Sequence, residues 1–230
     1  MQAINAAYAQ ARGIAESNEE SDIRILSTDE MTGIQALEHK FPDKLPAPGM
    51  KAKQEFEYIR HGTVSATAFL DVATGRIEEP YLNSTRNEAD FVNAVDHVLQ
   101  SDPGKTWVII ADNLNTHYSA SLVEYTANEI GFTGDLGEKG KCGILKNTES
   151  RISFLTDPSH RIRFLYTPKH CSWMNQIEIW FGIVNRQLLK RKSYRSVEEL
   201  VKSFLNYVEQ YNRLFAHPFN WKYTTTPLGD

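Results

Sequence analysis

The chain has 230 residues, of which 41% are hydrophobic and 23% are charged, as in one soluble globular domain with a substantial core. Its formal net charge of −4 argues against a general nucleic-acid coat protein, because phosphate binding depends on lysine and arginine. No apolar run approaches the roughly 18 residues that a membrane span needs. The N-terminus also lacks a signal-peptide pattern, so we expect a cytoplasmic protein with no membrane contact.

The apolar pattern predicts a mixed α/β domain. Residues 1–20 are expected to form a helical or disordered lead-in, and residues 21–230 the folded domain. The predicted strands cover residues 23–28, 57–60, 64–72, 77–82, 107–111 and 162–166, and the predicted helices cover 87–99, 119–130, 174–190 and 196–211. This order gives a sheet flanked by helices, as in the ribonuclease-H-like fold, although many other α/β domains share it. Residues 131–160, rich in glycine and lysine, predict an insertion before the last strand.

Three acidic residues stand out by their positions in these elements. Asp112 directly follows the apolar strand 107–111, and Asp29 ends the strand-like run 23–28. Glu178 falls on the flank of the apolar stripe of the helix predicted over 174–190, where we expect little contact with water. Because a buried carboxylate must be paired, hydrogen-bonded or bound to metal, the three predict a divalent-metal site.

Each acid also has a plainer interpretation. Asp112 is equally compatible with a turn residue that caps the chain as it leaves the sheet. Asp29 resembles part of a helix N-cap, and Glu178 is compatible with a buried partner of Arg186. Clustered carboxylates are, however, the ligands of two-metal phosphoryl transfer, in which Mg²⁺ ions about 4 Å apart act on the attacking and leaving oxygens. Candidates for the surroundings of such ligands are Asn113, His117 and Asn175, although His117 is also compatible with a cap of the following helix.

Basic residues form two local groups although the net charge of the chain is negative. A solvated surface and a phosphate-binding surface are equally compatible with each group. Trp173 is either a core residue or a platform that stacks on a base. The candidate nucleic-acid-binding residues are Arg163, Lys169, His170 and Trp173 in one group and Lys190, Arg191, Lys192 and Arg195 in the other.

Several motifs resemble the catalytic domain of mariner-like insertion-sequence transposases, which belong to the DDE endonuclease superfamily. The similarity extends from about residue 22 to the end of the chain, and its most specific motif is Asn175-Gln176-Ile177-Glu178 preceded by Pro168. The other similar stretches are Asp29-Glu30, residues 58–63, 70–75 and 111–113, residues 167–181 around the specific motif, and residues 196–200 and 216–219.

This resemblance implies a ribonuclease-H-like fold with metal ligands at Asp29, Asp112 and Glu178. The implied chemistry is Mg²⁺-dependent hydrolysis of DNA at transposon ends, followed by attack of the freed 3′-hydroxyl on a target duplex, usually at a TA dinucleotide. Mn²⁺ is expected to substitute for Mg²⁺. The partner is then double-stranded DNA, and the expected active form is a homodimer.

Two features depart from the family pattern. Full-length relatives have helix-turn-helix modules before the catalytic domain, and we expect this chain to be a truncated copy, an isolated catalytic domain or one part of a split reading frame. Asp112 and Glu178 are 66 positions apart, longer than the usual mariner-like spacing, and the insertion 131–160 accounts for the excess. Two other functions stay open: an inactive remnant that acts only as a DNA-associated or scaffolding protein, and a nuclease that acts on RNA–DNA hybrids.

Overall fold

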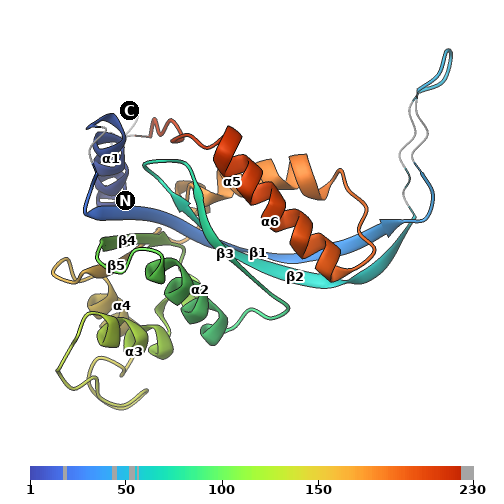
Figure 1. The fold of residues 1–230 in the computed structure, drawn as a ribbon. Helices are drawn as coiled ribbons and strands as arrows, with labels where there is room; N and C mark the ends of the chain where they lie inside the picture. The colour runs from blue at the N-terminus through green and yellow to red at the C-terminus, as the bar shows by residue number, and fades with distance from the viewer. Residues whose placement is uncertain (18–19, 43–45, 52–54, 56, 224–230) are drawn as a thin grey trace, which may run out of the picture.

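A five-stranded mixed sheet in the order β3-β2-β1-β4-β5 forms the centre of the molecule in the computed structural model (Figure 1). The structure describes residues 1–17, 20–42, 46–51, 55 and 57–223. The strands are β1 (Ile23–His39), β2 (Tyr58–Asp71), β3 (Ile77–Asn83), β4 (Thr106–Ala111) and β5 (Ile162–Tyr166). The α-helices are α1 (Gln2–Ser17), α2 (Glu88–Gln100), α3 (Ala120–Glu129), α4 (Thr148–Leu155), α5 (Ile177–Val184) and α6 (Val197–Leu214).

The sheet joins an antiparallel half to a parallel half at β1. β1 pairs with β2 in antiparallel register along most of its length, from Leu26 opposite Asp71 to His39 opposite Tyr58. On its other side β1 is parallel to β4, but only from Ile23 to Ser27. β4 lies between β1 and β5 and is buried along almost its whole length, as its uninterrupted apolar sequence predicts. The remainder of β1 therefore extends well beyond the parallel half.

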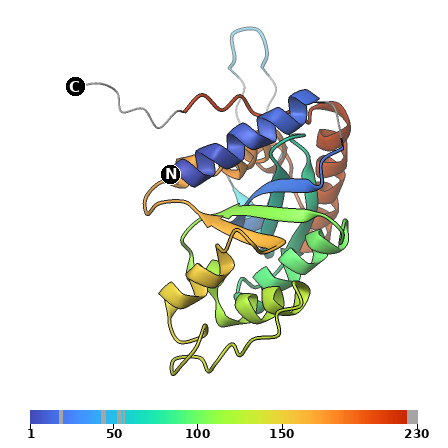
Figure 2. The ribbon, with the colours of Figure 1, turned by 90° about the vertical axis from the view of Figure 1, so that its left-hand side faces the viewer.

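Helices cover both faces of the sheet (Figure 2). α2, α3 and α4 enclose one core, which contains Phe91 and Leu122 together with Phe164 of β5. α5 and α6 pack on the opposite face of β1 and β2, where Trp180 and Phe204 are buried. α1 covers the same face nearer β4 and β5. None of the helices in the described ranges combines the length and apolar character that crossing a membrane requires.

The predicted strands lie at the right positions, but β1 and β2 are longer than the sequence predicted. The stretches predicted as separate strands near 57–60 and 64–72 form the single strand β2. β1 continues to His39 rather than ending at residue 28, because β2 supplies partners along its length. Asp29 is consequently inside a strand, and the prediction that it ends one is wrong. Residues 131–160 contain the eight-residue helix α4, whose Leu155 is fully buried.

The single helix predicted over 174–190 is divided into three pieces. Residues 172–174 form a 3₁₀ turn, α5 occupies Ile177–Val184, and Asn185–Leu189 form a π-helical turn. Asn175 has an extended backbone, with φ −91° and ψ 107°, so the α-helix cannot include it. The π-helical turn alters the direction of the side chains that follow α5.

Candidate active site

The parallel pairing of β1 with β4 brings Asp29 and Asp112 to the same end of the sheet. Ser27 is opposite Ile110 in this register, and two further residues along each strand place Asp29 beside Asp112. Asp112 directly follows β4. The carboxyl ends of parallel strands are where ligands bind in open α/β sheets, so the two acids occupy a favourable edge.

Asn175 holds the start of α5 against β1. Its amide nitrogen donates to the backbone oxygen of Thr28 at 2.7 Å, and its amide oxygen accepts the hydroxyl of Ser27. That hydroxyl oxygen also accepts the backbone N–H of Ile177 at 2.9 Å. Asn175 and Ser27 are both fully buried, so this connection is shielded from water. It fixes the first turn of α5, which contains Glu178, next to the strand that contains Asp29.

The prediction that Glu178 is buried is wrong. α5 is apolar on most sides, but it packs against the sheet only through the stripe that contains Ile177, Trp180 and Val184. Glu178 and Ile179 lie on the outer face, where Ile179 is 43% exposed. Glu178 consequently needs no ion pair with Arg186, and it is accessible from solvent at the carboxylate end of the sheet.

The three carboxylates influence one another's ionisation. Burial raises the pKa of Asp29 to about 7, and the charges of Asp112 and Glu178 contribute to the increase. Although Glu178 is exposed overall, partial desolvation of its carboxyl group and the charge of Asp112 also raise its pKa. Asp29 is only 9% exposed, and its Oδ1 accepts the backbone N–H of Glu30 at 2.8 Å. The three side chains therefore form one electrostatically coupled anionic group.

A buried histidine links Asp112 to a fourth carboxylate. Nδ1 of His117 lies 2.7 Å from Oδ1 of Asp112, and its Nε2 lies 3.1 Å from Oε2 of Glu30. The ring of His117 is fully buried and packs 4.2 Å from the ring of Phe91. The Glu30 side chain is 2% exposed. Oδ1 of Asp112 also accepts the backbone N–H of Leu114 at 2.9 Å, and no described residue bonds Oδ2, which is available to a ligand.

The two acidic side chains that contact His117 favour its charged form. Burial alone would lower the pKa of His117, but hydrogen bonds to Asp112 and Glu30 and their charges raise the pKa to about 9. Burial raises the pKa of Asp112, yet the hydrogen bond and charge of His117 outweigh it, so that this pKa is below its usual value. Near neutral pH the His117 side chain is therefore an imidazolium, and Asp112 beside it is a carboxylate. Buried charges of this kind are stable only when they are paired.

Two polar residues of the site were not predicted from the sequence. Glu30 follows Asp29 in the strand and so points to the opposite face of the sheet, toward α2 and His117. The charge of Arg86, in the loop between β3 and α2, contributes to lowering the pKa of Asp112. Neither residue has a spacing that would single it out. The third predicted neighbour, Asn113, donates its side-chain amide to the backbone oxygen of Thr167 and so joins the loops after β4 and β5.

The donor set has the chemistry of a Mg²⁺ site without a closed cage. Among the described residues, no group of three or more His, Cys, Asp or Glu side chains is arranged to hold a metal ion by itself. Asp29, Asp112 and Glu178 nevertheless provide carboxylate oxygens on one coupled surface. Mg²⁺ is commonly bound by a few carboxylates, with waters and substrate phosphates completing its shell. The residues present therefore fit this ion.

The structure separates the predicted nucleic-acid-binding residues. Arg163 lies within β5 opposite Val108, set back from the exposed residues Lys169 and His170 in the following loop. Trp173 is 50% exposed, and its ring stacks 6.4 Å from that of Trp221. The second group, Lys190, Arg191, Lys192 and Arg195, follows α5 and lies around two adjoining cavities at the far part of β1.

Comparison with known proteins identifies a family model and solved structures that are similar to this chain. A sequence model described as "DDE superfamily endonuclease" matches residues 24–201. Two solved structures, the Mos1 mariner paired end complex with Mn and a pre-cleavage Mos1 transpososome, each align with a TM-score of 0.52 and 12% identity. Each alignment covers 88% of this chain and 54% of the other, so the chain spans about half the length of those proteins. No curated protein sequence matches. The shared fold confirms the prediction of a ribonuclease-H-like α/β domain.

Proposed function

Because the chain belongs to the DDE superfamily endonuclease family, we propose that it is the catalytic domain of a DNA transposase. The observation that supports this proposal most strongly is the coupled group of Asp29, Asp112 and Glu178 at the carboxyl end of the parallel strands. Its proposed reactions are strand cleavage at transposon ends and strand transfer into target DNA. Residues 21–230 would be the catalytic unit and residues 1–20 a lead-in to it.

In the proposed cleavage, the oxygen of water forms a bond to phosphorus while the bond from phosphorus to the 3′-oxygen breaks. The products are a 3′-hydroxyl and a 5′-phosphate. In strand transfer, that 3′-hydroxyl attacks a target phosphodiester and displaces the target's own 3′-oxygen. Asp29, Asp112 and Glu178 would hold Mg²⁺, with Mn²⁺ as a substitute. When bound, such ions activate the attacking oxygen and stabilise the leaving oxygen.

The remaining residues of the site would orient these ligands. His117 fixes Oδ1 of Asp112 through a 2.7 Å contact, and Glu30 fixes the imidazole from its other side. Asn175 ties α5 to β1 and so sets the position of Glu178 relative to Asp29. Supporting contacts of this kind hold metal ligands in a productive geometry. The proposed partner is double-stranded DNA and the proposed active form is a homodimer.

The experiment that tests the function is nicking of an end-labelled DNA duplex with Mg²⁺, with Mn²⁺ and with chelator, beside an RNA–DNA hybrid of the same sequence. The proposal predicts cleavage of the duplex that requires the metal. Absence of cleavage under all conditions would favour an inactive remnant, and cleavage confined to the hybrid would favour a hybrid-specific nuclease.

A further inference from the structure

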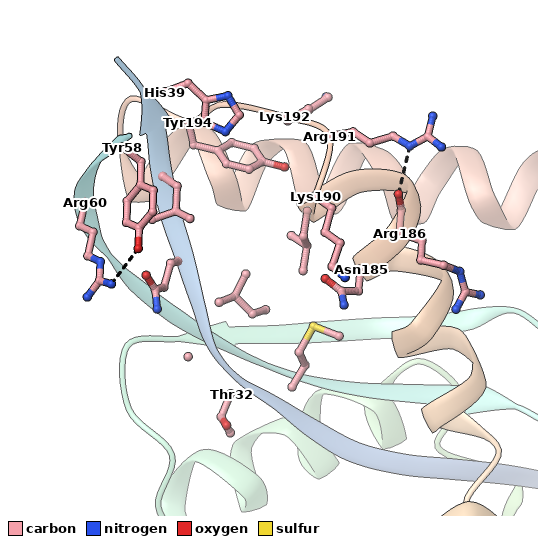
Figure 3. A pocket seen from close by; sticks show the side chains of 16 residues that line it. Thr32, His39, Tyr58, Arg60, Asn185, Arg186, Lys190, Arg191, Lys192 and Tyr194 are labelled. Carbon is pink, nitrogen blue, oxygen red and sulfur yellow. Dashed lines mark hydrogen bonds between the residues drawn. The ribbon is translucent and has the colours of Figure 1, made fainter. Parts of the chain in front are cut away.

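A basic groove lies along the part of β1 that extends beyond β4. It is a cavity of about 860 Å³ bounded by residues 31–39 of β1, by β2 and by the segment 185–194 after α5 (Figure 3). Among the described residues that line it, none is Asp or Glu, although the whole chain has more acidic than basic residues. Its cations are Arg60, Arg186, Lys190, Arg191 and Lys192. The groove is therefore a local positive surface on an acidic protein.

These five cations are not neutralised by the protein. Within the described ranges, none of them forms an ion pair with an acidic side chain. Arg60 donates to the hydroxyl of Tyr58 at 3.2 Å, and Nε of Arg191 donates to the backbone oxygen of Arg186 at 3.1 Å. Both contacts are with neutral groups. The positive charge of the groove is thus available to an external anion.

A buried hydroxyl in the groove is an independent sign of a ligand. Tyr194 is 2% exposed, and its hydroxyl oxygen has no hydrogen-bond partner among the described residues. Figure 3 shows this hydroxyl, together with Asn185 and Lys190, directed into the cavity, while the guanidinium groups of Arg60 and Arg191 extend at its rim. Buried polar groups are nearly always paired, so a ligand with oxygen acceptors would complete this site.

The groove begins beside the three carboxylates. Its first lining residue, Met31, is two positions after Asp29 on β1, and Asn185 is two helical turns after Glu178. From Asp29 to Leu37 the strand advances by about 26 Å at about 3.3 Å per residue. This length corresponds to about eight base pairs of B-DNA at 3.4 Å per pair. A duplex that enters the groove would therefore reach the carboxylates.

We propose that this groove binds the phosphate backbone of the DNA duplex on one side of the cleaved phosphate. This inference rests on the proposed function, because it takes DNA as the substrate of the adjacent acids. The edge of β1 beyond Ser27 would also accept a strand from a second copy of the chain, since β4 pairs with it only as far as that residue. A protein strand would leave the five cations uncompensated, whereas phosphates compensate them.

The test is DNA affinity measured by fluorescence anisotropy in chelator, where no cleavage occurs, with a duplex of about 20 base pairs over a range of salt concentrations. The double variant Lys190→Gln/Arg191→Gln should bind about tenfold more weakly. The slope of log K against log salt should fall by up to about 1.8, or about 0.9 for each lost phosphate contact. The matched control is Lys139→Gln/Lys141→Gln, which removes two exposed cations in the segment between α3 and α4, outside the groove.

A second variant tests the groove without changing charge. Tyr194→Phe should weaken binding about threefold to tenfold, as expected for one lost hydrogen bond. Tyr125→Phe removes a hydroxyl that bonds Asp96 outside the groove and should not change affinity.

Equal affinity and equal salt slope for the Lys190→Gln/Arg191→Gln variant and wild type would overturn the groove proposal while leaving metal-dependent nicking intact. If the Lys190→Gln/Arg191→Gln variant changes only the oligomeric state of the protein and not its DNA affinity, the groove binds a second copy of the chain. That result would also overturn the proposal. If wild type binds through the groove but never nicks DNA, the proposed function fails and the groove remains.

Discussion

Asp29 and Asp112 should respond in opposite ways to removal of their charge, although both are expected to hold the same metal. Asp29→Asn should stabilise the metal-free protein at pH 8. The pKa of Asp29 is about 7 in the folded state, against an ordinary value of 3.8. A difference of about three pKa units corresponds to at most about 4 kcal/mol at a pH above both values. At roughly 2–4 °C per kcal/mol, the melting temperature should rise by several degrees.

The difference between the folded and unfolded pKa of Asp29 also determines how the free energy of unfolding depends on pH. Between about pH 4 and pH 7 the folded state binds more protons at Asp29 than the unfolded state, so the free energy of unfolding of wild type falls as the pH rises. The advantage of Asp29→Asn should therefore be largest above pH 7 and should vanish near pH 4. Thermal melting in chelator at several pH values measures both effects.

The control is Asp112→Asn, which removes the partner of a charged, buried His117 and should lower the melting temperature. If Asp29→Asn is no more stable than wild type at pH 8, burial and the neighbouring acids do not raise the pKa of Asp29 as described. If Asp112→Asn is stabilised instead, His117 does not hold Asp112 as described.

Three further changes test separate parts of the structure. Glu30→Gln should lower the free energy of unfolding by about 1–3 kcal/mol, because His117 loses a charged partner; urea unfolding that matches wild type would contradict the pairing. Mg²⁺ should raise the melting temperature of wild type more than that of Asp112→Asn, since a cation that binds only the folded state stabilises it by mass action; equal increases would argue against Asp112 as a ligand. Gly75→Ala should cost about 2 kcal/mol or more, because Gly75 has φ +72° and an added Cβ would overlap the backbone of His217; an unchanged calorimetric melting temperature would refute this close packing.

Local sequence signals predicted most of the secondary structure. The uninterrupted apolar run before Asp112 identified the buried central strand, and the amphipathic pattern after Asn87 identified α2, for which Asn87 is the N-cap. The length of β1 was not predictable in this way. Its outer half alternates weakly, and its extent is determined by β2, a separate strand that begins 19 residues after β1 ends.

Errors at the site had a common origin. A helical wheel shows that Glu178 lies beside an apolar stripe, but not which flank of that stripe faces the sheet, and the structure leaves Glu178 exposed. The contact of Glu30 with His117 exists because β1 continues beyond Asp29 and directs alternate side chains toward α2. The sequence predicted a shorter strand, so this contact could not be predicted. The basic groove depends on both the extended β1 and the π-helical turn after α5, so no local pattern predicts its shape.

Asp29, Asp112 and Glu178 are expected to act as one metal-dependent cleavage site. The most direct measurement is the rate of Mg²⁺-dependent nicking of a labelled duplex by Asp112→Asn, by Glu178→Gln and by the double variant, with Glu198→Gln on α6 as the control. Each single variant should lose about a thousandfold or more in rate, since metal stabilisation of the transition state amounts to several kcal/mol. The double variant should be scarcely slower than either single one, because residues that act as a unit are not additive. A single variant that cleaves at the wild-type rate would show that the three acids do not form one site, as would losses that multiply in the double variant.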